Sequence, residues 1–178
     1  MFRLSTVKSQ LTLFLLIFWT MSIVILSKNA LTNTKESKVS INGSGLAIPR
    51  IVSLKNSLTY MRSGPGKEFP VKFELKQKGY PLKVVAEFNN WRKVMTYDNI
   101  SGWIHTQMLS SFRTGLITQK TLLKTIPSNT SSSLAKLLPN LLVNIRECKK
   151  NWCKVEIIKS KVYVGWIKKE SMWGSLKN

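Results

Sequence analysis

The sequence predicts an all-β protein in which two tandem small barrels follow an N-terminal hydrophobic helix. Three observations support this prediction: a motif that occurs twice, apolar residues that alternate at strand spacing, and one apolar segment near the N-terminus. The motif Asn-Trp-x-Lys-Val, followed by Gly-Trp-Ile, begins at Asn90 and recurs 61 residues later at Asn151. Self-similarity at a period of about 60 residues indicates two copies of one small unit. A chain of 178 residues is long enough for two such units.

The N-terminal segment predicts export. Arg3 and Lys8 precede residues 9–27, a run of 19 residues without a charge. A basic start followed by an apolar run is typical of a secretory signal peptide. The length is also close to the roughly 20 residues of a membrane-spanning helix. Residues 1–27 are therefore either a cleaved signal peptide or a retained N-terminal membrane anchor, and both alternatives place the rest of the chain outside the cytoplasm.

Residues 28–49 are polar and show no apolar period, so we expect a flexible linker there. Beyond it, the barrels are expected at residues 50–111 and 114–174. Short alternating runs separated by turn residues are typical of small all-β domains. In the first copy, Leu82, Val84 and Ala86 are expected to line the core. Residues 131–138 offer the best helix candidate, although they fit a strand and loop equally well.

Each tryptophan motif follows a two-residue hairpin loop. The loop is Asn89-Asn90 in the first copy and Lys150-Asn151 in the second. A two-residue loop of asparagines suits a type I′ turn, in which both central residues have positive φ. The expected hairpin fixes the pairing of the residues on either side of the loop.

One pair further from the loop, Glu87 faces Arg92, and Cys148 faces Cys153. Directly opposite positions in a non-hydrogen-bonded pair bring Cα atoms to about 4.5 Å, which is within the range of a disulfide. We therefore predict a structural Cys148–Cys153 bond, which export also favours. A redox-active pair is the competing reading, but such pairs usually have two intervening residues. At the matching site we expect a Glu87–Arg92 cross-strand ion pair, worth roughly 0.2–1 kcal/mol.

The four tryptophans of the repeated motif have two interpretations. They either plug the ends of barrels that hold few core residues, or expose one ring per copy along a groove for an extended ligand. The positions concerned are Trp91, Trp103, Trp152 and Trp166.

The run from Leu58 to Gly66 contains Arg-Ser-Gly-Pro, and the motifs at Asn90 and Gly102 follow it. Together these residues resemble the bacterial SH3-like domain family, over about residues 50–174. The resemblance implies exported barrels of five to six strands that bind peptidoglycan or envelope proteins. It also suggests ligand contacts in the first copy, because the second lacks the Arg-Ser-Gly-Pro loop. The positions suggested for ligand binding are Tyr60, Arg62, Trp91 and Trp103.

The tandem arrangement with a cysteine hairpin is similar to small exported proteins of Gram-negative bacteria, so we expect a periplasmic protein. Anchoring of residues 9–27 in the inner membrane is the alternative. Without residues 1–27 the chain has 26 basic and 8 acidic residues, a net charge of +18. This imbalance favours acidic partners. Export argues against nucleic acid, whose binding would otherwise suit a basic, tryptophan-containing surface.

Catalysis is poorly supported. The chain has one histidine, His105, and one aspartate, Asp98, so a Ser-His-Asp triad would require both. We expect no catalytic residues, no metal site and no cofactor. The predicted function is a non-enzymatic envelope binding module that recognises peptidoglycan or an envelope protein through the first barrel. The alternative is a structural or adaptor protein that docks a partner protein and has no affinity for the cell wall.

Overall fold

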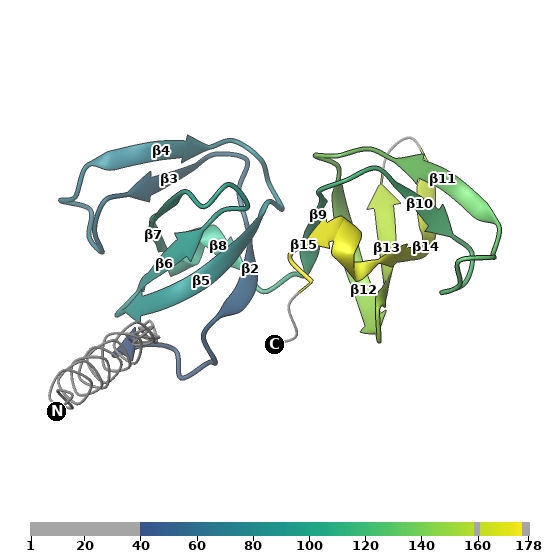
Figure 1. The fold of residues 1–178 in the computed structure, drawn as a ribbon. Helices are drawn as coiled ribbons and strands as arrows, with labels where there is room; N and C mark the ends of the chain where they lie inside the picture. Colours follow the sequence, from purple (N-terminus) through teal and green to yellow (C-terminus); the bar gives the residue numbers. More distant parts are fainter. Residues whose placement is uncertain (1–39, 159–160, 176–178) are drawn as a thin grey trace, which may run out of the picture. The chain divides into compact units, whose positions relative to one another are not determined.

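The computed structural model describes residues 40–158 and 161–175, and these form two curved sheets, one for each copy (Figure 1). Strands and two single-turn 3-10 helices make up the regular structure of these residues, which confirms the all-β class. The hydrophobic helix expected at residues 9–27 lies outside them. Within the described ranges, no helix is long and apolar enough to cross a membrane.

The first copy forms a sheet in the order β4-β3-β7-β6-β5-β2-β8, with β1 paired to β5. Its elements are β1 (Ser40–Ile41), β2 (Arg50–Leu54), β3 (Thr59–Arg62), β4 (Val71–Leu75), β5 (Pro81–Phe88), β6 (Trp91–Met95), β7 (Ser101–His105), the 3-10 helix η1 (Thr106–Met108) and β8 (Leu109–Ser110).

The second copy has the order β11-β10-β14-β13-β12-β9-β15, which repeats the topology of the first copy strand for strand. Its elements are β9 (Thr114–Ile117), β10 (Thr121–Lys124), β11 (Ser133–Leu137), β12 (Leu142–Lys149), β13 (Trp152–Ile158), β14 (Val162–Lys168), η2 (Lys169–Ser171) and β15 (Met172–Trp173). The repeat predicted from the tryptophan motif is therefore confirmed. Residues 131–138 contain a strand, β11, rather than a helix.

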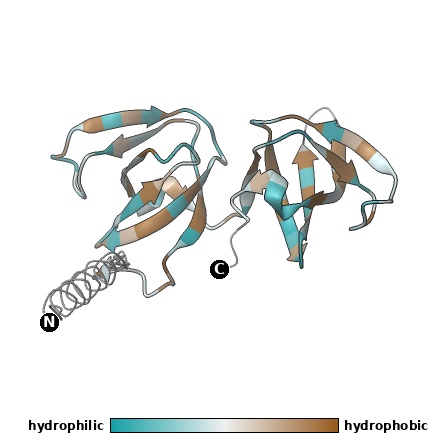
Figure 2. Cartoon of the chain, in the orientation of Figure 1, coloured by the Kyte–Doolittle hydropathy of each residue, from teal (hydrophilic) through white to brown (hydrophobic). Residues whose placement is uncertain are grey.

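Each copy has its own apolar core, and apolar residues alternate with polar ones along its strands (Figure 2). The buried residues of the first core are Leu54, Met61, Leu82, Val84, Val94 and Ile104. Those of the second are Ile117, Leu123, Leu137, Val143, Ile145, Cys153, Val155, Ile157, Ile167 and Met172. Neither set includes a tryptophan of the repeated motif, although Trp166 is itself buried, with 8% of its surface exposed.

The glycine before each Gly-Trp tryptophan faces the core at a point of close approach. A Cβ on Gly102 would lie 2.4 Å from Met61 Cγ and 2.8 Å from the Arg62 carbonyl oxygen. A Cβ on Gly165 would meet Leu123 Cγ and the Lys124 carbonyl oxygen at 2.7 Å. Since strand side chains alternate, an inward glycine directs the following tryptophan outward. The Gly-Trp-Ile motif thus packs its glycine and isoleucine against the core and places its tryptophan on the opposite side of the strand, where Trp103 is partly exposed and Trp166 is buried.

A β-bulge changes the alternation in the long hairpin of each copy. On β5, Val84 pairs with Val94 and Ala86 with Lys93, so that Val85 is an extra residue. Arg146 is the extra residue at the equivalent point of β12. The bulge moves Glu87 to the inward face, where it is fully buried, while Ala86 is only partly buried. The expectation that Ala86 lines the core is therefore wrong.

The chain contacts the first sheet well before the expected start at Arg50. Strand β1 pairs in parallel with β5, and Asn89 N donates to the Ile41 carbonyl oxygen at 3.0 Å. Ile48 is buried as well. A flexible linker over residues 28–49 consequently does not describe residues 40–49, which are part of the first copy. Residues 28–39 lie outside the described ranges.

Candidate functional site

The outward side chains of β3, β6 and β7 form one continuous surface in the first copy, which we name the first outer face. Arg62 pairs with Trp103, and Trp103 pairs with Lys93, so these three residues form a row across the strands. The next row contains Trp91 opposite His105. Tyr60 lies two residues before Arg62, on the same side of β3, and is 47% exposed.

The structure therefore brings together all four residues suggested for ligand binding. They come from three neighbouring strands, although 43 positions separate the first from the last. The four are Tyr60, Arg62, Trp91 and Trp103. Their role in binding a ligand stays a prediction.

His105 has structural contacts on this face. Its ring meets Trp91 edge-on, with centroids 5.3 Å apart and an interplanar angle of 83°. This geometry is the favourable one for aromatic pairs. His105 Nδ1 also accepts a hydrogen bond from Gln107 N at 3.3 Å, which caps η1. The imidazole thus fixes the orientation of Trp91 and the start of η1.

Arg62 holds the loop that follows β3. Its Nη1 donates to the carbonyl oxygens of Lys67 and Phe69, at 3.0 and 2.7 Å. Ser63 N donates to the Pro70 carbonyl oxygen at 3.0 Å and closes the loop. The guanidinium therefore organises the edge of the first outer face.

The second copy keeps the same loop with other residues, 62 positions later. Lys124 takes the place of Arg62, and its Nζ donates to the Ser131 carbonyl oxygen at 2.7 Å. Thr125 N donates to the Ser132 carbonyl oxygen at 3.1 Å, as Ser63 N does to Pro70. Pro127 stands at the position of Pro65. The Arg-Ser-Gly-Pro sequence is absent from this copy, but the loop that it forms is present.

The glycine in the first loop is required by one neighbour. A Cβ on Gly64 would lie 2.4 Å from the Phe69 ring. The position of Phe69 is occupied in the second copy by Ser131, a much smaller residue, and Ile126 replaces Gly64. The two changes compensate each other sterically, which is why sequence comparison alone suggested that the loop had been lost.

The predicted Glu87–Arg92 pair is present, but it belongs to a buried cluster. Glu87 Oε1 lies 3.0 Å from Arg92 Nε and 2.5 Å from Arg50 Nη2. Ser44 donates to the same carboxylate from its backbone N, at 2.6 Å to Oε2, and from its hydroxyl. All three charged side chains are at least nine-tenths buried. The cross-strand pair is therefore confirmed, but the value of roughly 0.2–1 kcal/mol was taken from exposed pairs and does not describe a buried cluster.

Two parts of this cluster had no signal in the sequence. Arg50 is 37 positions from Glu87, and Ser44 lies in the stretch predicted to be a linker. A Cβ on Gly43 would lie 2.3 Å from Glu87 Oε2, so the chain can pass the carboxylate only with glycine at this position. The Asn-Gly-Ser-Gly stretch thus passes close to the Glu87 carboxylate and binds it through Ser44.

Hydrogen bonding keeps the Glu87 carboxylate ionised. Burial is the largest influence and raises the pKa of Glu87, but the hydrogen bonds from Ser44 and Arg50 and the positive charge of Arg50 together outweigh it. The pKa is consequently held below its ordinary value of 4.5.

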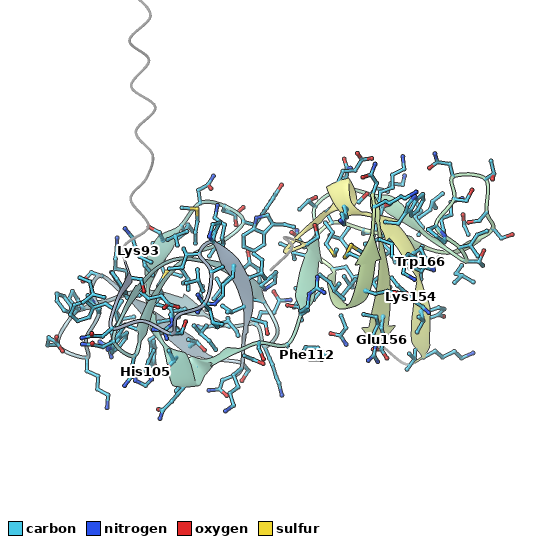
Figure 3. The ribbon with its side chains drawn as sticks, turned by 90° about the horizontal axis from the view of Figure 1, so that it is seen from below. Lys93, His105, Phe112, Lys154, Glu156 and Trp166 are labelled. Atoms are coloured by element: carbon cyan, nitrogen blue, oxygen red, sulfur yellow. A yellow bond between two sulfur atoms is a disulfide. The ribbon has the colours of Figure 1, made fainter. Side chains whose placement is uncertain are left out.

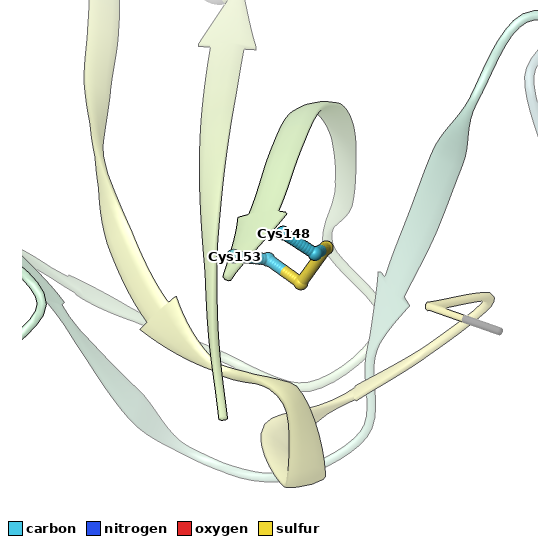
Figure 4. The surroundings of a disulfide bond; sticks show 2 residues. All are labelled: Cys148 and Cys153. Atoms are coloured by element: carbon cyan, nitrogen blue, oxygen red, sulfur yellow. A yellow bond between two sulfur atoms is a disulfide. The ribbon is translucent and has the colours of Figure 1, made fainter. Parts of the chain in front are cut away.

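The second copy has the predicted disulfide at this place (Figure 4). Cys148 and Cys153 are opposite each other on β12 and β13, with Cα atoms 4.0 Å apart and an S–S bond of 2.02 Å. Arg113, which corresponds to Arg50, is exposed.

Positive φ occurs at Asn89 (46°) and Lys150 (48°), whereas Asn90 and Asn151 are not among the described residues with positive φ. The type I′ turn predicted for both loops is therefore wrong at the second central position.

Among the described residues, no three His, Cys, Asp or Glu side chains are placed to hold a metal ion. The arrangement on the first outer face offers aromatic surface, one lysine and the ordered loop.

Comparison with known proteins agrees with the repeat. No curated protein sequence matches the chain. Two solved structures from Trichomonas vaginalis, those of NlpC2 and NlpC1, are similar at 14% identity with a TM-score of 0.32. The chain aligns over 70% and 76% of its own length but spans only 48% and 49% of theirs. The family model for the bacterial SH3 domain matches residues 55–111 and again residues 125–174, more than half of the chain. The protein therefore belongs to the bacterial SH3 domain family and carries two copies of the domain in tandem.

Proposed function

We propose that the chain is a non-enzymatic binding protein of the bacterial envelope, which recognises peptidoglycan or an envelope protein through the first outer face. In this proposal the chain is exported and acts in the periplasm. The observation that carries it is the register of β3, β7 and β6, which aligns Arg62, Trp103 and Lys93 in one row. Membership of the bacterial SH3 domain family supports the same general role.

The composition of this face suits recognition of an extended ligand. Trp91, Trp103 and His105 are all partly exposed, and Tyr60 is nearly half exposed. Aromatic rings offer large contact area at low cost in side-chain entropy. Lys93, which is exposed beside Trp103 in the same row, adds a positive charge for a carboxylate group. Acidic stem peptides of peptidoglycan combine both kinds of feature.

The alternative is an adaptor that docks a partner protein. One observation favours it: the β3–β4 hairpin exposes several large apolar side chains, each 38% exposed or more. Grouped apolar residues on a surface often mark a protein interface. They are Leu58, Phe69, Val71 and Phe73. The two candidate functions therefore use neighbouring but different parts of the first copy.

Sedimentation of the whole chain with purified peptidoglycan at moderate salt tests the proposal. We expect the unaltered chain to sediment and Tyr60→Ala and Trp103→Ala to lose most of this binding, while circular dichroism confirms folding. Phe112→Ala is the matched control, because Phe112 is 54% exposed but lies outside the face. If the unaltered chain stays in solution, the cell-wall role is wrong and the adaptor function remains.

A further inference from the structure

The outward side chains of β10, β12, β13 and β14 form a surface that alternates lysine with tryptophan, which we name the lysine–tryptophan face. In one row, Trp166 on β14 lies between Lys124 and Lys154. In the next row, Trp152 on β13 lies between Lys168 and Lys149. Figure 3 shows Lys154 and Trp166 close together on this copy.

Two of these lysines are specific to the second copy. Lys149 stands where the first copy has Phe88, and Lys168 stands where it has His105, as the pairing with Trp152 and Trp91 shows. The lysine–tryptophan face is therefore more positive than the corresponding face of the first copy, although the strands have the same arrangement. From Arg113 to Trp173 the chain has twelve basic and three acidic residues.

The acidic neighbours of this face only partly neutralise it. Lys149 Nζ lies 3.1 Å from Glu147 Oε2, and Lys168 Nζ lies 3.7 Å from Glu170 Oε1. Both pairs are largely exposed, so solvent screens them. Within the described residues, Lys154 has no carboxylate partner, and Lys124 donates to a backbone carbonyl oxygen instead. Glu156, the remaining carboxylate, pairs with Arg146.

A cavity of about 370 Å³ lies beside Trp152 at one end of this face. Asparagine side chains offer hydrogen bonds there, and two lysines offer positive charge. Its lining residues are Asn129, Asn151, Trp152, Lys168, Lys169 and Glu170. The volume is within the range of sites that accept small groups. Asn129 belongs to the loop that Lys124 organises, so the retained loop closes one side of the cavity.

We propose that the lysine–tryptophan face binds an extended acidic peptide. Alternate side chains of an extended peptide are about 6.6–7 Å apart on one face, the same repeat that separates the two rows along β13 and β14. Acidic residues at alternate positions therefore meet lysines in successive rows, and the apolar parts of the peptide pack on Trp152. Charge complementarity selects this partner.

A single-stranded nucleic acid fits less well. Such ligands need several exposed rings on which successive bases stack. Trp166 is only 8% exposed, and Lys149 Nζ lies 5.9 Å from its ring centroid, so that this ring is covered. Trp152 alone remains accessible among the rings of the face.

Calorimetric titration of the whole chain with two peptides tests the proposal: three Glu-Thr repeats and, for comparison, three Gln-Thr repeats. We expect only the acidic peptide to bind, with an affinity that falls as salt is added. The variant carrying both Lys154→Gln and Lys168→Gln should bind it about tenfold more weakly. Lys161→Gln, an exposed lysine beyond the far end of β13 from Trp152, should bind normally.

Equal affinity for both peptides, or an unchanged affinity in the double variant, would overturn the proposal. Tighter binding of polygalacturonate or of a single-stranded oligonucleotide than of the acidic peptide would overturn the choice of ligand. The site does not depend on the first outer face, so Tyr60→Ala should leave this titration unchanged. Failure of the cell-wall test and failure of this one are thus separate results.

Discussion

Glu87 and Cys148 occupy the same position in the two copies, one residue pair away from the hairpin loop and just after the β-bulge. Each faces a partner on the next strand, Arg92 or Cys153. One copy thus joins its strands by a buried ion cluster and the other by a covalent bond. The backbone accommodates both because the bulge turns this position inward in each case.

The buried cluster predicts a large effect of removing the carboxylate charge. Glu87→Gln leaves Arg50 and Arg92 buried without a counter-charge. We expect the free energy of unfolding to fall by about 3 kcal/mol, measured by chemical denaturation. Glu74→Gln is the control: its pair with Lys76 is exposed, so the change should stay within about 0.5 kcal/mol. Equal effects of the two substitutions would contradict the buried role.

Acid should weaken the same cluster. Because the pKa of Glu87 lies below 4.5 in the folded state, the unfolded chain binds a proton at this residue more readily. The stability that Glu87 contributes is present above pH 4.5 and is lost as pH falls through the lower native pKa. The difference in unfolding free energy between the unaltered chain and Glu87→Gln should shrink between pH 7 and pH 3. A constant difference would show that this carboxylate does not titrate as described.

Reduction should affect the second copy selectively. The loop closed by Cys148 and Cys153 is short, so the loop-entropy relation gives about 2 kcal/mol of stabilisation. A variant with serine at both positions should show faster amide hydrogen exchange in β12 and β13. Exchange in β5 and β6 of the first copy serves as the internal control and should not change.

The inward glycines should resist substitution. Gly102→Ala brings a Cβ against Met61 and a backbone oxygen, which we expect to cost about 1–3 kcal/mol in thermal or chemical unfolding. Gly66→Ala provides the comparison. The atoms nearest to its Cβ belong to the flexible Glu68 side chain, which can move away, so a small effect is expected. A similar cost at both sites would refute the close-approach argument.

The exchange of Gly64 and Phe69 for Ile126 and Ser131 predicts non-additive mutations. Gly64→Ala should destabilise the first copy, because the new Cβ meets the Phe69 ring. In a Phe69→Ser background the same substitution should cost much less, and a double-mutant cycle measures the coupling. Strict additivity would mean that the aromatic ring is not the obstacle.

The repeat, the all-β class and the Cys148–Cys153 pairing were predictable because they depend on local spacing. The bulges at Val85 and Arg146 were not, since an extra residue in a strand has no sequence signature of its own. Missing the bulge led to Ala86 being placed in the core. It also hid the burial of Glu87, whose sequence neighbourhood resembles a surface strand.

The candidate site likewise has features that the sequence predicted and features that it did not. Trp91 and Trp103 lie on one face because the two motifs stand on the paired strands β6 and β7, and Tyr60 and Arg62 join them because β3 pairs with β7. The part played by Arg62 in holding its loop depends on contacts with Lys67 and Phe69 that spacing does not reveal. Likewise, the retained loop of the second copy became visible only through its backbone hydrogen bonds.

The two ways of joining the long hairpins give the halves of the chain different vulnerabilities. Acid protonates Glu87 but has no effect on a bond between sulfur atoms, whereas a reductant breaks the Cys148–Cys153 bond and leaves the arginine cluster intact. Neither acid nor a reductant alone removes both the Glu87 ion cluster and the disulfide. A change of surroundings that loosens one half therefore leaves the other half with its hairpin still closed.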